Sequence, residues 1–184
     1  MKLPIAKYGD PILRAKGKRV AEIDEEIREL AFNMLETMHA SNGVGLAAQQ
    51  IGRALQLTVL DVSQVEDRPS TMKLNGKEVD PIASMPLILI NPELEPGEEQ
   101  ILGSEGCLSI PDINADVMRA FSVITRARTL DEEQIEIEAT GLLARALQHE
   151  VDHLNGILFI ARISSAAKAS LASRLKRMQK ENRM

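Results

Sequence analysis

The chain has 184 residues, of which 44% are hydrophobic and 27% charged, an ordinary globular balance that needs no disulfide to support a core. A formal net charge of −5 argues against a nucleic-acid-binding surface spread over the whole protein, and a single cysteine excludes an internal disulfide. We find no apolar signal-like region at the N-terminus and no stretch that approaches the roughly 18 apolar residues of a membrane span, so we expect no membrane segment and a cytoplasmic location.

A helix is predicted over residues 24–40. Apolar side chains recur there at helical spacing, and Asp24 is placed to cap the N-terminus ahead of two glutamates. His39 lies at the end of this helix with no companion ligand nearby in the sequence. We therefore interpret it as a surface or capping histidine.

The segment GVGLAAQQ, residues 43–50, follows this helix. Two glycines flank Val44 and suit a backbone that passes close to a ligand chain, whereas the lysine of a nucleotide-binding loop is missing. Taken alone, the segment is more simply a helix-to-turn junction with small packing residues. Gln50 is its most interesting member, because a neutral amide can donate a hydrogen bond to a developing oxyanion.

Short strands are predicted at residues 55–62, 87–90, 99–102, 122–126 and 134–139. Between the first two, residues 63–85 form a polar excursion that is interrupted by Pro69, Asn75-Gly76 and Pro81. These breakers indicate a mobile loop or a hairpin flap. A further strand-like piece is expected at residues 157–160.

The only cysteine, Cys107, lies in the run GSEGCLS at residues 103–109. A lone cysteine of a cytosolic protein is usually a small buried hydrophobe. The glycines of this run, however, let another backbone approach closely, and the thiol is available for coordination. Cys107 is therefore a candidate metal ligand.

The motif QHEVDHLNG ends an amphipathic helix that is predicted over residues 141–156. Positions i and i+4 share a helix face, so His149 and His153 can bind one metal ion while Glu150 contacts a water on it. Polar residues on an ordinary helix are the alternative. Two imidazoles on a largely apolar helix need partners, however, and a cation satisfies both rings. With Cys107 they make three ligands and leave the open fourth position of a catalytic site.

A basic helix is predicted at the C-terminus, residues 165–184, with Leu171, Leu175 and Met178 as its apolar stripe. Its cations are Arg174, Lys176, Arg177, Lys180 and Arg183. Such a run is usually a solvated face, and docking to an anionic surface is the alternative. The whole pattern predicts an α+β fold: short antiparallel strands packed around a central metal-binding helix, with a C-terminal helix.

The three blocks GVGLAAQQ, EGCLS and QHEVDHLNG, in this order and spacing, resemble the peptide deformylase family over about residues 1–175. The resemblance implies that residues 1–184 form a single catalytic domain. It further implies an enzyme that removes the formyl group from the formyl-methionine terminus of new bacterial or organellar polypeptides.

The resemblance also implies a role for each motif. Three residues are expected to bind one divalent metal ion, usually Fe²⁺, with Zn²⁺, Ni²⁺ or Co²⁺ able to replace it: Cys107, His149 and His153. In the implied reaction, metal-bound hydroxide attacks the formyl carbon and Glu150 carries a proton to the leaving amine. Gln50 and the backbone N–H of Leu108 are expected to stabilise the oxyanion.

The substrates implied are N-formyl-methionyl nascent peptides. Their backbone is expected to lie as an added strand between Val44-Gly45 and Gly106. The methionine side chain is expected in an apolar pocket formed by Val44 together with Leu142 and Ala146. One supporting ion pair is also implied, and it joins Glu105 to Arg119.

Three features depart from some members of the family. Asn114 stands where some members have an arginine near the peptide path, and Arg145 stands at a position that is apolar in others, so we expect a different pocket rim. Residues 63–85 are longer than in compact members and could cover the cleft. Some members also contact the ribosome through a C-terminal helix, which suggests ribosome docking through the basic helix.

Two other functions would fit parts of this pattern. A zinc peptidase with the same helical motif usually takes its third ligand downstream, but no histidine follows His153 and Glu181 is the only later carboxylate. A ribosome-associated factor that has lost its chemistry is the second alternative. The intact set of Cys107, His149, His153, Glu150 and Gln50 argues against it.

Overall fold

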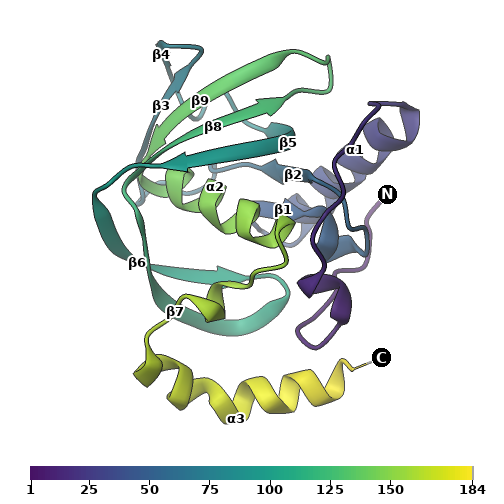
Figure 1. The fold of residues 1–184 in the computed structure, drawn as a ribbon, viewed down its shortest axis with the longest axis vertical. Coiled ribbons are helices and arrows are strands. Elements are labelled where there is room, and N and C mark those ends of the chain that lie inside the picture. Colours follow the sequence, from purple (N-terminus) through teal and green to yellow (C-terminus); the bar gives the residue numbers. More distant parts are fainter. Residues whose placement is uncertain (184) are drawn as a thin grey trace.

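The structure is a computed structural model that describes residues 1–183 (Figure 1). Its helices are α1 (Glu25–Ala40), α2 (Gly141–Leu154) and α3 (Ser165–Glu181), with short 3-10 helices at Pro11–Arg14, Ala48–Ile51 and Phe159–Ala161. Its strands are β1 (Gly45–Ala47), β2 (Leu57–Leu60), β3 (Ser70–Leu74), β4 (Lys77–Val79), β5 (Leu87–Pro96), β6 (Gln100–Cys107), β7 (Ile110–Ala120), β8 (Ser122–Arg128) and β9 (Gln134–Thr140).

The strands form two antiparallel sheets on opposite sides of one helix. Seven strands make the larger sheet in the order β1-β2-β5-β8-β9-β3-β4, and β6 pairs with β7 in the smaller one. In Figure 1, α2 lies between the strands of the larger sheet and the β6–β7 hairpin, and α3 lies beyond that hairpin. The predicted α+β fold with a central helix and a C-terminal helix is confirmed.

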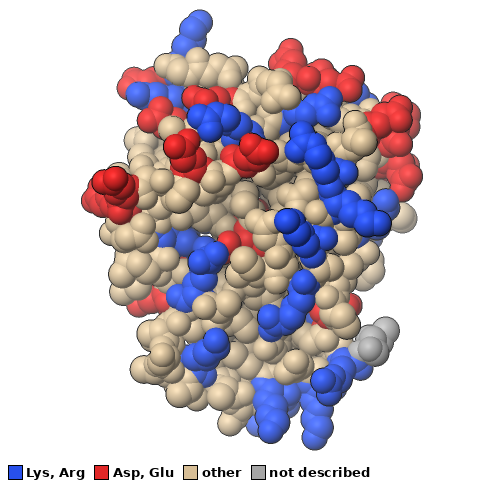
Figure 2. Space-filling model, in the orientation of Figure 1, with Lys and Arg blue, Asp and Glu red and all other residues tan. Residues whose placement is uncertain are grey.

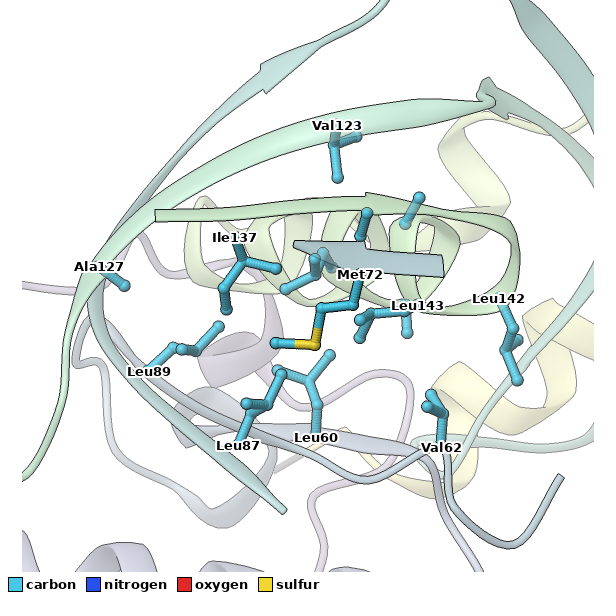
Figure 3. Packing of buried hydrophobic residues seen from close by; sticks show 14 of the residues in the cluster. Leu60, Val62, Met72, Leu87, Leu89, Val123, Ala127, Ile137, Leu142 and Leu143 are labelled. Carbon is cyan, nitrogen blue, oxygen red and sulfur yellow. The ribbon is translucent and has the colours of Figure 1, made fainter. Parts of the chain in front are cut away.

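The core packs the apolar side of α2 against the larger sheet. Figure 3 shows Leu142 and Leu143 of α2 facing side chains from β2, β3, β5, β8 and β9. Met72 of β3 reaches into the centre of this cluster and is almost completely buried. Because α2 is packed against the larger sheet in this way, the polar residues near its C-terminal end are held in a fixed place.

The polar excursion at residues 63–85 contains a β-hairpin. Strands β3 and β4 are joined by Asn75 and Gly76, which both have positive φ angles, as hairpin turns with an Asn-Gly sequence do. Strand β3 also pairs with β9 over four residue pairs. The hairpin therefore belongs to the larger sheet through β3. The buried side chain of Met72 also anchors it to the core, unlike a free flap.

Several segments differ from the sequence prediction: β1 was not predicted as a strand, and β5 and β6 are longer than the predicted strands at 87–90 and 99–102. Strand β7 was not predicted, because Pro111, Asp112 and Asn114 suggest turns, although residues 113–119 alternate between the buried and solvent sides. The piece expected as a strand at 157–160 is wrong: it leads into the 3-10 helix Phe159–Ala161 and has no ladder partner. The ring of Phe159 instead stacks on an imidazole of α2, with centroids 5.9 Å apart.

The ends of α1 and β2 are tied together beside the segment that carries GVGLAAQQ. His39 Nε2 lies 2.8 Å from Asp61 Oδ2, so this histidine has a side-chain partner. The backbone N–H of Asp61 donates to the carbonyl of Val44 over 2.8 Å. These bonds hold the entrance to β1 in place.

Helix α3 packs on the β6–β7 side of the molecule. Leu175 is buried, and Leu171 and Met178 are half-buried against the same apolar cluster. Arg174 Nη2 donates to the carbonyl of Asp112 over 2.8 Å. Within residues 1–183, no helix combines the length and apolar character required to cross a membrane.

Candidate metal centre and catalytic cleft

Two elements that are far apart in the chain bring three metal-binding atoms together. Helix α2 carries His149 and His153 one turn apart, and Cys107 is the last residue of β6. Cys107 Sγ lies 3.3 Å from His153 Nε2, which lies 3.2 Å from His149 Nε2. Within the described part of the chain, these three side chains form a cluster whose ligand atoms all lie within 4.8 Å of one another.

The donor set fits a divalent metal ion. Metal–ligand bonds of about 2.0–2.3 Å in a tetrahedral site imply ligand separations of roughly 3.3–3.7 Å. The separations of 3.3 and 3.2 Å are close to that range, and one thiolate with two imidazoles is a ligand set that transition metals accept. Three protein ligands leave one position for water or substrate, as catalytic sites require.

A buried carboxylate orients one of the histidines. Glu105 Oε1 lies 2.8 Å from His149 Nδ1, so Nδ1 can donate and Nε2 is left to face the other ligands. Arg119 donates two hydrogen bonds to Glu105, of 2.9 and 3.0 Å. Burial alone would raise the pKa of Glu105, but the bonds from His149 and Arg119 hold it well below its ordinary value.

The protein environment of the histidine pair favours a single positive charge. Burial alone would lower the pKa of His149, but its hydrogen bonds to Cys107 and Glu105 raise it to about 10. Burial and the charge of His149 lower the pKa of His153 well below its ordinary value. A metal ion at the cluster must displace the proton on His149 Nε2, whereas Nδ1 keeps its proton toward Glu105. Binding of the ion and loss of the Nε2 proton are therefore coupled.

Glu150 lies beside the cluster and outside the group of ligands. Its Oε1 is 4.0 Å from His149 Nε2, and its Oε2 is 3.4 Å from the hydroxyl of Thr58. Burial is the main cause that raises the pKa of Glu150 to about 7, against the opposing effect of His149. A Cβ on Gly45 would meet the Glu150 carboxylate at 2.8 Å, so only glycine permits this close approach. A carboxyl with this pKa can both accept and release a proton at neutral pH.

Gln50 presents its amide nitrogen to the cluster. Its Oε1 accepts a hydrogen bond of 2.9 Å from the backbone N–H of Ala47, and this bond fixes which end of the amide faces the site. Its Nε2 donates to the hydroxyl of Ser109 over 3.1 Å and lies 3.5 Å from Cys107 Sγ. A preoriented N–H beside the metal ligands can stabilise negative charge on a reacting oxygen.

These groups meet at a cleft of about 490 Å³ whose walls come from α2 and from both sheets. The cleft is lined by most of the residues that the sequence motifs suggested: Val44, Gly45, Gln50, Glu105, Gly106, Cys107, Leu108, Leu142, Ala146, His149 and Glu150. His153 and Arg119 lie behind this lining, and both are buried. Asn114 and Arg145 also reach the cleft.

Several contacts of this site could not be read from the motifs. Thr58 beside Glu150 comes from the middle of a buried strand, where a threonine carries no distinctive pattern. Asp152 accepts a hydrogen bond of 2.6 Å from Arg119 and a two-bond ion pair from Arg162. Ser109 had a weak signal, because it directly follows Cys107 and Leu108 in the block EGCLS.

The chain matches one known family over most of its length. A sequence model described as "Polypeptide deformylase" matches residues 2–169. Curated relatives named peptide deformylase include one from Acidobacterium capsulatum, 43% identical over 96% of this chain and 95% of its own length. Another, from Opitutus terrae, is 42% identical over 100% of this chain and 96% of its own length.

Solved structures agree with the sequence relatives. The crystal structure of the peptide deformylase from Thermotoga maritima is 36% identical and has a TM-score of 0.76, covering 89% of this chain and 99% of that one. The peptide deformylase from Ehrlichia chaffeensis is 33% identical with a TM-score of 0.81, and the match covers 96% of each chain.

Proposed function

This chain belongs to the polypeptide deformylase family and is an enzyme of that family, and on this premise we propose that it removes the N-formyl group from the formyl-methionine terminus of newly made polypeptides, releasing formate. One observation carries the proposal. The ligand cluster of Cys107, His149 and His153 lies beside Glu150 and Gln50 at one cleft.

Enzymes of this family depend on a metal ion, and the cluster described above is the group that would hold it. We propose Fe²⁺ as the physiological ion, with Zn²⁺, Ni²⁺ and Co²⁺ as substitutes. When bound, such an ion acts as a Lewis acid and lowers the pKa of water toward roughly 7, which supplies the nucleophile at neutral pH.

The protein groups then act on the formyl unit. Gln50 Nε2 and the backbone N–H of Leu108 donate to the formyl oxygen as negative charge develops on it. Glu150 accepts a proton from the attacking water and delivers it to the amine nitrogen as the formyl C–N bond breaks, and its pKa of about 7 supports both halves of that transfer.

The substrate backbone is proposed to lie along β1, next to Val44 and Gly45 and opposite Gly106. Strand β1 is an edge strand of the larger sheet, so its outer backbone groups can pair with an extended peptide. The methionine side chain would enter the apolar part of the cleft between Leu142 and Ala146, which both line it. Backbone pairing and one side-chain pocket together place the formyl group at the cluster.

We also propose that α3 docks the enzyme on the ribosome. Lys and Arg side chains gather along the lower edge of the face in Figure 2, over α3. Lys176, Arg177 and Lys180 are exposed, whereas Leu175 on the opposite side is buried. A helix that anchors one side and presents cations on the other suits an anionic surface such as ribosomal RNA.

The reaction is tested with matched peptides. The protein is purified anaerobically, its metal content is measured, and formate release is assayed with formyl-Met-Ala-Ser and with acetyl-Met-Ala-Ser as the control. One metal ion per chain and formate release from the formyl peptide alone are the expected results. A metallated protein that releases no formate would disprove the proposed reaction while leaving the metal site intact.

A further inference from the structure

Arg145 is a buried arginine on α2, one turn before His149, and the proposed chemistry gives it no role. We infer that Arg145 is a positioning residue. Its guanidinium fixes the distance between the strand that carries Cys107 and the helix that carries both histidines. The inference rests on the proposed metal site and adds a residue that controls its geometry.

The first observation is the bond between Arg145 and Glu105. Arg145 Nη1 donates over 2.8 Å to Glu105 Oε2, while His149 Nδ1 lies 2.8 Å from the other oxygen, Oε1. Both contacts come from the same face of α2, four residues apart, so the carboxylate is held at two points by one helix. Arg119 of β7 binds the same carboxylate from the other side.

The second observation is that the same guanidinium binds the backbone of both strands in the smaller sheet. Arg145 Nη1 donates to the carbonyl of Val117 in β7 over 2.8 Å, and Nη2 donates to the carbonyl of Ile101 in β6 over 2.9 Å. A longer contact of 3.4 Å reaches the carbonyl of Gly103. Arg145 thereby connects α2 to the strand that ends at Cys107.

The third observation is the space that β6 leaves for this side chain. A Cβ on Gly103 would lie 2.8–2.9 Å from three guanidinium atoms of Arg145. Because the guanidinium is held by hydrogen bonds to Glu105, Val117 and Ile101, it cannot move aside freely. Glycine at position 103 therefore fits the inferred role of Arg145.

Protein hydrogen bonds orient only one ring of the histidine pair among residues 1–183. His153 Nδ1 is buried and has no hydrogen-bond partner among residues 1–183, in contrast to His149 Nδ1. Glu105 therefore orients His149, and two arginines tie Glu105 to α2: Arg145 directly, and Arg119 through Asp152. Groups that orient a metal ligand typically change metal affinity by 10- to 100-fold when they are removed.

The test measures cobalt binding without any turnover. Anaerobic apoprotein is titrated with Co²⁺ against a competing chelator, and the thiolate-to-Co²⁺ absorption band is recorded. Arg145→Met and Gly103→Ala are expected to bind Co²⁺ about 10- to 100-fold more weakly and to shift this band. The matched controls are Arg126→Met, which removes an exposed ion-paired arginine, and Leu102→Ala, which changes an exposed neighbour on β6. Both are expected to match the parent chain.

Parent-like affinity and spectrum in Arg145→Met overturn the inference, even if the apoprotein melts at a lower temperature. If Arg145→Met does not fold, Gly103→Ala decides, because it keeps the guanidinium but displaces it. Weaker cobalt binding by Gly103→Ala supports the positioning role, and parent-like binding rejects it. Failure of the parent chain to bind Co²⁺ would reject the proposed metal site itself, and the inference with it.

Discussion

Glu150 is 3% exposed, and its surroundings give a common residue type its unusual proton affinity. Close packing against Gly45 excludes water from the carboxylate, and Thr58 offers it only a long contact of 3.4 Å. Desolvation of the charged form raises its pKa to about 7. The same carboxylate on a solvated helix would stay ionised and could not release a proton at neutral pH.

Glu150→Gln is expected to keep the metal ion and to lower deformylation by about 100- to 10,000-fold, because the amide has the same shape but cannot transfer the proton. Metal content and formate release are measured on the same preparation. Glu138→Gln, at an exposed position on β9, serves as the control. Near-normal turnover by Glu150→Gln would remove Glu150 from its proposed role.

The residues of the candidate site differ in how well the sequence can predict them. His149 and His153 share a helix face by spacing alone, and the block EGCLS marks Cys107. The contacts of Arg145 are different, because they depend on where β6 and β7 cross α2. From the sequence we expected Arg145 to alter the rim of the pocket, whereas its guanidinium donates to Glu105 and to buried carbonyls.

Elements are anchored to the core by a few side chains, and Met72 is the clearest case. It is the buried residue of β3, whereas its neighbour Lys73 is exposed. Strand β3 pairs with β9, so loss of the Met72 contacts weakens the outer part of the larger sheet. Helix α2, which carries His149 and His153, packs against the same apolar cluster.

Met72→Ala is expected to lower the free energy of unfolding by about 2–5 kcal/mol, because the cavity cannot collapse fully in a packed core. Urea unfolding of the apoprotein measures the change. Lys73→Ala, one residue away on the solvent side, is expected to change it by less than about 0.5 kcal/mol. Equal effects from both substitutions would mean that the hairpin does not pack as described.

The contact between the ends of α1 and β2 predicts a pH dependence. Burial alone would raise the pKa of Asp61, but bonds from Ser63 and His39 lower it below its ordinary value of 3.8. A carboxyl with a lowered folded-state pKa stabilises the protein above its unfolded-state pKa, and this stabilisation is lost as the pH falls through the lower value.

We therefore expect Asp61→Asn to cost about 1 kcal/mol at pH 6 and progressively less below pH 4. Urea unfolding in the presence of EDTA, from pH 6 to pH 3, measures the difference without any metal contribution. His39→Gln is a useful companion, because it removes one partner of Asp61 and leaves both bonds from Ser63. A difference between Asp61→Asn and the parent chain that stays constant across this range would contradict the assignment.

The order of the elements could be predicted from the sequence only where periodicity is clear. Apolar spacing placed α1 and α2, and alternation placed β9. Strand β7 could not be predicted, because its solvent-facing positions hold turn-forming residues. Its buried positions, which alternate with exposed ones, are Ile113, Val117 and Arg119. An arginine in a buried position hides such a pattern, since its burial is possible only when Glu105 and Asp152 are beside it.

At the scale of the whole molecule, the sequence resemblance to peptide deformylases is confirmed by relatives that match almost the full chain. The net charge is −5, but the charged residues are unevenly distributed over the surface, since Lys and Arg are concentrated on α3. An uneven charge allows a protein to be acidic overall and still approach an anionic partner from one side.

Lys176→Glu with Lys180→Glu is expected to reduce co-sedimentation with ribosomes at least tenfold at low salt, without changing turnover of a short formyl peptide. These side chains are exposed, so the substitutions leave Leu175 packed, which truncation of the helix would not. Lys73→Glu with Lys77→Glu reverses the same number of charges on the β3–β4 hairpin and serves as the control. Equal ribosome binding by both double variants would eliminate α3 as the docking element.

Strand β1 has one further consequence for the proposed activity. It is only three residues long and lies at the edge of its sheet, where a peptide can pair with it through main-chain groups. Every polypeptide has the same main chain, so this pairing makes almost no distinction between one nascent protein and another. Each such bond adds only about 0.5–1.5 kcal/mol, and three residues offer few of them. Under the proposed function, this pairing contributes about equally to binding of every formyl-methionyl terminus and little to discrimination among them.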